Sequence, residues 1–163
     1  MGNICWAQRN PSTSSERTRF VLTDSVYNEL RHFLANSSGI TLKDTIIIKY
    51  DYNRESCWNM LDRQDDAYIK GIIRQQQQRI QKEQMARPGI SVFMYREPGN
   101  NINKLKKWDP DIQIDHTGNL QKWLFGKRKI CGNSVIVLPD RTVLLFPSDA
   151  HFQALHYAVA TEK

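Results

Sequence analysis

The sequence predicts an α+β fold, in which helices pack on an antiparallel sheet of about five strands. Most strands are expected in the C-terminal half, where short β-branched and aromatic runs alternate with turn residues. A helical period near the N-terminal end and a long polar run in the middle predict an N-terminal helix and a central helical segment. At 163 residues the chain is most simply one domain. We place that domain at residues 20–163, after a flexible leader, residues 1–19.

The first helix is expected to begin after Thr23 or Asp24, because either side chain can cap a helix. Four apolar residues, Val26, Leu30, Phe33 and Leu34, then share one face. Residues 36–39, Asn-Ser-Ser-Gly, end this helix. Residues 45–50 follow with three consecutive isoleucines, which predicts a strand buried on both faces.

Residues 54–86 are rich in helix formers and are terminated by Pro88 and Gly89. Gly71 can interrupt this segment, so two helices are an alternative. Four consecutive glutamines, residues 75–78, favour either a coiled-coil contact or the exposed face of a surface helix.

The C-terminal half is expected to contain strands at residues 90–95, 112–114, 120–125, 134–138 and 142–146. Pro139 and Asp140 form the turn of the clearest hairpin. Ser148 is a good N-cap for a C-terminal helix packed on the sheet. The expected inner face of that helix holds Phe152, Leu155, His156 and Val159.

The formal net charge of +6 favours acidic partners, such as anionic lipid, nucleic acid or an acidic protein face. The cations form two clusters. We expect membrane or partner binding by Lys104, Lys106 and Lys107, and by Lys127, Arg128 and Lys129 near Lys122. A solvated basic face is the alternative. Trp108 and Trp123 among lysines resemble base-stacking sites only loosely, so nucleic acid is the weaker choice.

The chain begins Met1-Gly2-Asn3-Ile4-Cys5, a start that favours lipidation. Removal of Met1 would expose Gly2, which accepts a myristoyl group, and Cys5 is close enough to take a palmitoyl group. Two acyl groups matter, because one myristoyl group alone gives only marginal membrane binding. Trp6 departs from the usual pattern, which has Ser or Thr there, and an ordinary start with a free Cys5 thiol is the alternative.

This start resembles that of plant-directed bacterial type III secreted effectors, several of which open Met-Gly-Asn-Ile-Cys. The segment 8–19, rich in Ser, Thr, Asn and Arg, resembles their secretion leaders. The resemblance implies delivery into a host cell, acylation there, and a host signalling or immune component as partner.

Three cysteines, Cys5, Cys57 and Cys131, and no secretory signal peptide argue against a disulfide framework, so reduced thiols are expected. No Cys and His spacing matches a zinc site, and we expect no metal and no cofactor. A cation held by Asp109, Asp111 and Asp115 is a weaker alternative, because the Gly and Glu of a calcium loop are missing.

Cys131 is the best candidate nucleophile, because the cations at 127–129 favour a thiolate. His116 or His151 is the candidate general base. The candidate groups to orient it are Asp115, Asp140 and Asp149. A small structural thiol at the start of a strand is the alternative explanation of Cys131.

The leading expectation is therefore a lipid-anchored interaction protein at the cytoplasmic face of a membrane, the plasma membrane, where it binds or inhibits a protein partner. The candidate contact loops are residues 36–39, 96–101 and 126–129. The alternative is a cysteine-dependent hydrolase or transferase that uses Cys131 and a histidine.

Overall fold

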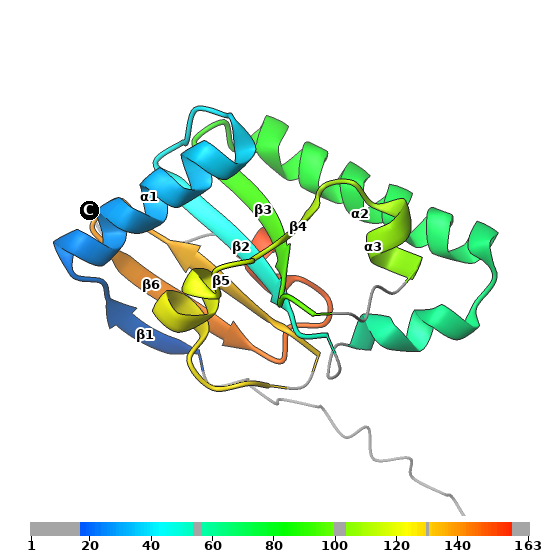
Figure 1. The fold of residues 1–163 in the computed structure, drawn as a ribbon. Helices are drawn as coiled ribbons and strands as arrows, with labels where there is room; N and C mark the ends of the chain where they lie inside the picture. Colours follow the sequence, from blue (N-terminus) through cyan, green and yellow to red (C-terminus); the bar gives the residue numbers. More distant parts are fainter. Residues whose placement is uncertain (1–16, 54–56, 100–103, 130, 158–163) are drawn as a thin grey trace, which may run out of the picture.

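The computed structural model describes residues 17–53, 57–99, 104–129 and 131–157, and it places helices on both faces of one mixed sheet (Figure 1). The six strands lie in the order β1-β6-β5-β2-β3-β4. Their bounds are β1 Thr18–Val21, β2 Thr45–Asp51, β3 Ile90–Arg96, β4 Ile112–Ile114, β5 Asn133–Val137 and β6 Thr142–Pro147. The helices are α1 Asp24–Ser38, α2 Asp66–Ala86 and α3 Lys104–Trp108, with shorter helical turns η1 Cys57–Arg63, η2 Gln121–Phe125 and η3 Gln153–His156.

The α+β class is confirmed, but the expectation of an antiparallel sheet is wrong. β3 pairs parallel with β2, and β4 pairs parallel with β3. The cause is the connection through η1 and α2, which returns the chain to the starting end of the sheet before β3 begins. The isoleucine run of β2 fits this arrangement, because a central strand covered on both faces is apolar throughout.

The prediction of the first helix is confirmed. Thr23 caps α1, with its side-chain oxygen 3.3 Å from the backbone nitrogen of Val26. Gly39 ends the helix in the left-handed conformation, and its N–H donates to the Ala35 carbonyl at 2.9 Å. Leu30 and Leu34 are fully buried against the sheet.

The central segment contains two helical elements, but Gly71 does not separate them. Asp65 caps α2 by accepting a hydrogen bond from the Tyr68 N–H at 2.8 Å, and this cap separates α2 from η1. Gly71 lies inside α2. Gln76 and Gln77 are half-buried toward the sheet, whereas Gln75 and Gln78 are exposed.

The predicted strand at residues 120–125 is wrong, because the chain there forms the π-helical turn η2. The buried Asp115 carboxylate accepts hydrogen bonds from the Gln121 N–H at 3.2 Å and from the Tyr50 hydroxyl at 3.3 Å. Leu124 and Phe125, adjacent in sequence, are both buried, which a strand with alternating faces would not allow against a one-sided core.

The predicted C-terminal helix is reduced to the short turn η3. Ser148 has φ +54, so it does not have the extended backbone of an N-cap. Instead, the Asp149 carboxylate binds the start of η3, because it accepts hydrogen bonds from the N–H groups of Gln153 at 2.7 Å and Ala154 at 3.2 Å. His156 is exposed, and Val159 lies outside the described residues.

The hairpin prediction is confirmed by β5, β6 and the Pro139–Asp140 turn, in which the Leu138 N–H donates to the Thr142 carbonyl at 2.9 Å. The strand β1 was not predicted, and part of the expected leader therefore belongs to the sheet. β1 is short and mostly exposed, so it carries little of the apolar pattern on which strand prediction depends.

The two faces of the sheet have separate cores. α1 and η2 cover one face, where β2 and β3 contribute aromatic residues such as Tyr50 and Tyr95. α2, α3 and η3 cover the other face, around residues such as Ile47, Met94 and Phe152.

Most of the candidate contact loops lie at one edge of the sheet. β6 runs in the same direction as β2, because β5 lies between them and is antiparallel to both. The ends of β2, β3 and β6 and the starts of β5 and β1 therefore lie together, and we call this the Asp51 edge. The opposite edge, where β2 begins, is the Thr45 edge.

Candidate functional site

A buried cluster of charged and polar side chains lies at the Asp51 edge, on the face covered by α2. Its members are at most 5% exposed: Lys49, Asp51, Arg96, Asp109 and Ser134. Side chains alternate along a strand, so Lys49 and Asp51 share the face of Ile47. The register places Met94 on one side of Lys49 and Ser134 on the other. A charged cluster this deep requires internal partners, because burying an unpaired charge is costly.

Lys49 is the centre of the cluster. Its Nζ donates to the Asp149 carbonyl at 2.7 Å and lies 3.8 Å from Asp51 Oδ1. It is also 5.8 Å from the centre of the Phe152 ring. Lys49 therefore ties the end of β2 to the segment that follows β6.

Asp51 lies directly against the backbone of Gly132. A Cβ at Gly132 would be 2.3 Å from Asp51 Oδ1 and 2.8 Å from the Tyr50 carbonyl oxygen, and Gly132 has φ +73. Both facts require glycine. The Gly132 carbonyl accepts from the Asp149 N–H at 3.2 Å, which holds this strand start in place. A buried carboxylate is thus fixed beside the residue that follows Cys131.

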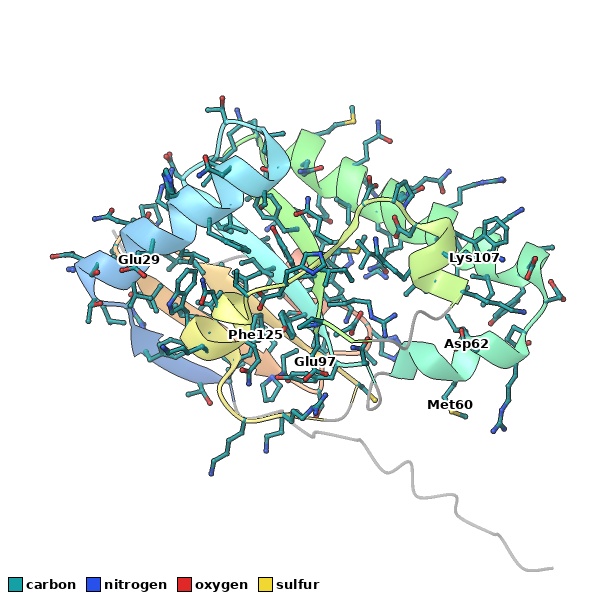
Figure 2. All side chains as sticks on the ribbon, in the orientation of Figure 1. Glu29, Met60, Asp62, Glu97, Lys107 and Phe125 are labelled. Atoms are coloured by element: carbon teal, nitrogen blue, oxygen red, sulfur yellow. The ribbon has the colours of Figure 1, made fainter. Side chains whose placement is uncertain are left out.

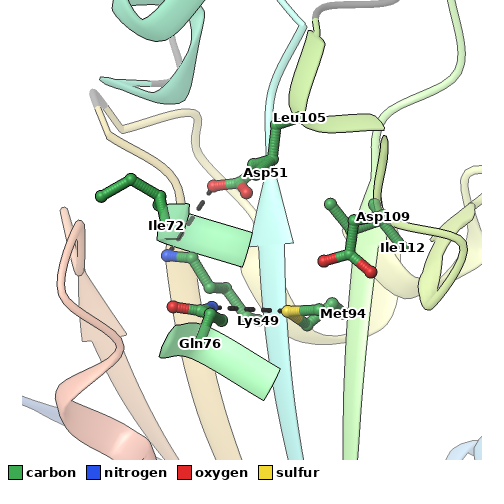
Figure 3. A pocket seen from close by; sticks show the side chains of 8 residues that line it. All are labelled: Lys49, Asp51, Ile72, Gln76, Met94, Leu105, Asp109 and Ile112. Carbon is green, nitrogen blue, oxygen red and sulfur yellow. Dashed lines mark hydrogen bonds and ion pairs between the residues drawn. The ribbon is translucent and has the colours of Figure 1, made fainter. Parts of the chain in front are cut away.

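The cluster borders a small hollow that opens to solvent between α2, α3 and the sheet (Figure 3). It has room for about one water molecule and is lined by Lys49, Asp51, Gln76 and Asp109, together with Ile72, Met94, Leu105 and Ile112. The hollow lies over the α2 face of the sheet, because Lys49, Met94 and Ile112 belong to strands β2, β3 and β4. The hollow is therefore far smaller than a drug-sized ligand site of roughly 300–1,000 Å³, and it suits a water molecule.

Asp109 is an acid of this hollow whose charge is disfavoured by burial. Burial raises the pKa of the Asp109 carboxyl, and the neighbouring charge of Asp111 adds to the effect. Hydrogen bonds from the Asp111 N–H at 3.0 Å and from Gln77 at 3.4 Å oppose it. Asp109 therefore holds a proton more readily than a solvent-exposed aspartate does.

Cys131 is disulfide-bonded, so the expectation of reduced thiols is wrong for this residue. It is half-buried, has φ +68, and stands at the start of β5 beside Gly132 and Asp51. The side chain of Cys57 and all of Cys5 lie outside the described residues. In a disulfide a sulfur is the electrophile of thiol–disulfide exchange rather than a nucleophile.

The candidate bases do not hydrogen-bond to the acids that were proposed to orient them. His116 and His151 are both exposed. Asp115 holds Tyr50 and η2, and Asp149 caps η3. Asp140 accepts from the Thr142 N–H at 2.9 Å, which lowers the pKa of this exposed carboxyl. Within the described ranges, none of these three carboxylates hydrogen-bonds to either histidine.

The structure gives the lysines at 104–107 contacts within the molecule. Lys104 Nζ donates to the Gln64 carbonyl at 2.7 Å and lies 3.4 Å from Asp66. Lys106 Nζ donates to the Ile112 carbonyl, and Lys107 Nζ lies 4.8 Å from the centre of the Trp108 ring. These contacts stabilise α3 against η1 and β4.

The second basic cluster, on residues 127–129, lies at the Asp51 edge. Arg128 forms an ion pair with Glu97, just beyond β3, and its guanidinium lies 5.1 Å from the centre of the Tyr52 ring. Lys127 and Lys129 are exposed. Figure 2 shows Lys107 and Asp62 near α2 and α3, well separated from Glu97, so the two basic clusters occupy different regions.

The predicted lipidation residues, Gly2 and Cys5, lie outside the described residues. Within the part that the structure describes, no helix is both long and apolar enough to cross a bilayer. The same part contains no group of three or more His, Cys, Asp or Glu side chains arranged to hold a metal ion.

Sequence reasoning missed Lys49, Asp51 and Arg96. A signal was present, because a lysine and an aspartate follow the isoleucine run inside a single strand. Charges at the end of an otherwise buried strand mark a place where functional side chains gather. Comparison of the chain with protein-family models, with curated proteins and with solved structures finds no match.

Proposed function

We propose that this chain is a lipid-anchored protein that binds a protein partner at the cytoplasmic face of a membrane. The start Met1-Gly2 with Cys5 supplies the acyl sites. The supporting observation is where the leader joins the fold: Arg17 precedes β1 at the Asp51 edge, because Thr18 lies opposite Leu145 near the end of β6. An anchor on the leader would hold the loops of this edge close to the bilayer.

Two of the three expected contact loops lie at that edge. Residues 97–99 extend from β3, and residues 126–129 precede β5. The third, residues 36–39, ends α1 before β2 and belongs to the Thr45 edge. A rigid sheet that presents clustered loops is a common basis for recognition. By the resemblance of its start, the partner would be a host signalling or immune component.

Replacing Gly2 by Ala in a eukaryotic host is expected to move the protein from the membrane fraction to the soluble fraction. Replacing Cys5 by Ser is expected to leave weak, reversible binding, because one myristate gives a membrane binding constant of only about 10⁴ M⁻¹. Fractionation and intact-mass analysis provide the measurement. A wild-type chain without C14 and C16 adducts, or a Gly2→Ala chain that stays on membranes, would overturn the anchor.

The disulfide at Cys131 favours a second candidate function, thiol–disulfide exchange with a protein dithiol. At the cytoplasmic face of a membrane a disulfide is usually transient, and either catalytic or redox-sensing. A client thiolate would attack the Cys131 disulfide, form a mixed disulfide and release one cysteine thiolate of this chain. The second client thiolate would then displace the remaining sulfur, which leaves an oxidised client and two reduced cysteines. The buried Asp51, beside Gly132, is placed to exchange the proton of the released thiol.

A reduced dithiol peptide incubated with the full chain is expected to be oxidised in a one-to-one ratio, as followed by alkylation and mass spectrometry. Cys131→Ala should abolish this, and Asp51→Asn should slow it and change its pH dependence. Asp44→Asn, which changes an exposed acid at the Thr45 edge, is the matched control. A peptide that is cleaved or acylated rather than oxidised would instead support the hydrolase or transferase that uses Cys131 with His116 or His151.

A further inference from the structure

We infer that the Asp51 edge carries a lipid-facing surface formed by Arg17, Lys127 and Lys129, which docks on anionic headgroups. This inference rests on the proposed membrane anchor and adds an orientation to it. Of the two basic clusters in the sequence, the inference selects residues 127–129 for lipid binding, and it assigns Lys104 and Lys106 of the other cluster a structural role.

The first argument is the position of these residues relative to the leader. Arg17 is the first described residue, and it lies at the end of the sheet where β6 stops. Residues 126–129 run from η2 toward the start of β5, at the same edge. Arg128 fixes this loop to the sheet through Glu97, beyond β3, and Tyr52, beyond β2. The loop is therefore held at the edge from which the leader departs.

The second argument is the availability of the charges. Lys127 and Lys129 are exposed, and within the described ranges neither forms an ion pair with an acidic residue. Arg17 is also exposed, and its guanidinium carbon lies 4.6 Å from the centre of the Tyr157 ring. By contrast, Lys104 and Lys106 are bound within the molecule.

The third argument is the distribution of exposed acids. Asp24, Asp44 and Asp140 are exposed and lie at the Thr45 edge, where β2 and β6 begin. At the Asp51 edge, Glu97 is paired with Arg128, and Asp149 is buried under η3. Of the other described acids that are exposed at this edge, Asp62 and Asp66 contact Lys104, and Asp65 caps α2, so all three lie on the α2 side. Among the described residues, a membrane at the Asp51 edge would thus meet positive charge near Arg17 and little opposing charge.

Anionic lipid is favoured over nucleic acid as the occupant for two reasons. Among the described residues, the surface is a group of three cations beside the half-buried Tyr157, and no exposed aromatic ring borders it on which bases could stack. It also lies at the edge where the chain leads from the proposed acyl sites into the fold, so it is the basic surface nearest in sequence to the anchor, and anionic lipid attracts Lys and Arg.

The test uses the full chain with an N-terminal His tag on vesicles that contain a nickel-chelating lipid, so that the chelate replaces the acyl anchor. Imidazole is added to compete for the nickel, and the fraction of protein that stays on the vesicles is compared between phosphatidylcholine vesicles with and without phosphatidylserine. Each lysine near an anionic surface strengthens binding by about fivefold. Lys127→Ala/Lys129→Ala is therefore expected to reduce the phosphatidylserine-dependent retention by about 25-fold.

The matched control is Lys43→Ala/Lys82→Ala, which removes the same charge from two exposed lysines outside the Asp51 edge. An equal loss in both double variants would show that net charge alone acts, and would overturn the inference. The inference would also be overturned if phosphatidylserine did not increase retention of the wild-type chain. Displacement of the wild-type chain by a single-stranded oligonucleotide at equal charge concentration would overturn it as well. Because the chelate supplies the anchor, failure here is separate from failure of acylation at Gly2.

Discussion

Asp109 is a single carboxyl whose burial makes the stability of the fold depend on pH. Its pKa is raised from 3.8, mainly by desolvation, so the folded chain binds a proton more tightly than the unfolded chain. A group of this kind favours folding while it is protonated. Its contribution is lost as the pH rises from the unfolded pKa through the folded one.

Replacing Asp109 by Asn should therefore raise the free energy of unfolding at neutral pH relative to wild type, and the advantage should shrink toward pH 4 and below. Asparagine can still accept the hydrogen bond from the Asp111 N–H through its carbonyl oxygen. Urea unfolding at a series of pH values measures the difference, with Asp44→Asn, an exposed acid at the Thr45 edge, as control. A variant less stable than wild type at neutral pH would indicate that the ionised Asp109 has a favourable partner.

At the scale of elements, η2 depends on one buried carboxylate from outside it. Asp115, before the turn, accepts from the Gln121 N–H and from the Tyr50 hydroxyl. Burial and the charge of Asp115 raise the pKa of the Tyr50 hydroxyl well above its usual range, so Tyr50 remains a donor. The π-helical turn, the end of β4 and the middle of the sheet are thereby joined.

Replacing Asp115 by Ala should lower the free energy of unfolding by about 3 kcal/mol, because two donors would lose their acceptor in the interior. Trp123 in η2 lies edge-on to Phe33 with ring centres 6.1 Å apart, so its fluorescence should report loosening of η2. Thr117→Ala, which removes only a partly buried bond to Asp115 Oδ1, should cost much less. Equal losses in the two variants would contradict this account.

For the whole molecule, the sequence predicted the elements that local signals determine. Thr23 and Gly39 delimit α1, and the Pro139–Asp140 turn delimits a hairpin between consecutive strands. The direction of β3 was not predictable in this way, because it depends on how a 21-residue helix crosses the sheet. The predicted strand at residues 120–125 was wrong for a similar reason, because the carboxylate that stabilises η2 belongs to Asp115, which lies outside this turn.

The candidate site was less predictable than the fold, because its contacts join distant parts of the chain. Lys49 donates to Asp149, 100 positions away, and Asp51 lies against Gly132. Because the partners in both contacts are far apart in the sequence, no short sequence motif could indicate either contact. Cys131 was identified from its sequence neighbours, but its oxidation state depends on a second sulfur that spacing alone does not identify.

The stacking of Arg17 on Tyr157 has a practical consequence for labelling. The chain enters and leaves the described fold at these two residues, which lie side by side at the Asp51 edge. A fluorescent protein fused to either terminus would crowd the surface assigned to lipid and could mimic a loss of docking. The Pro139–Asp140 turn, exposed at the Thr45 edge, is the better site for a reporter.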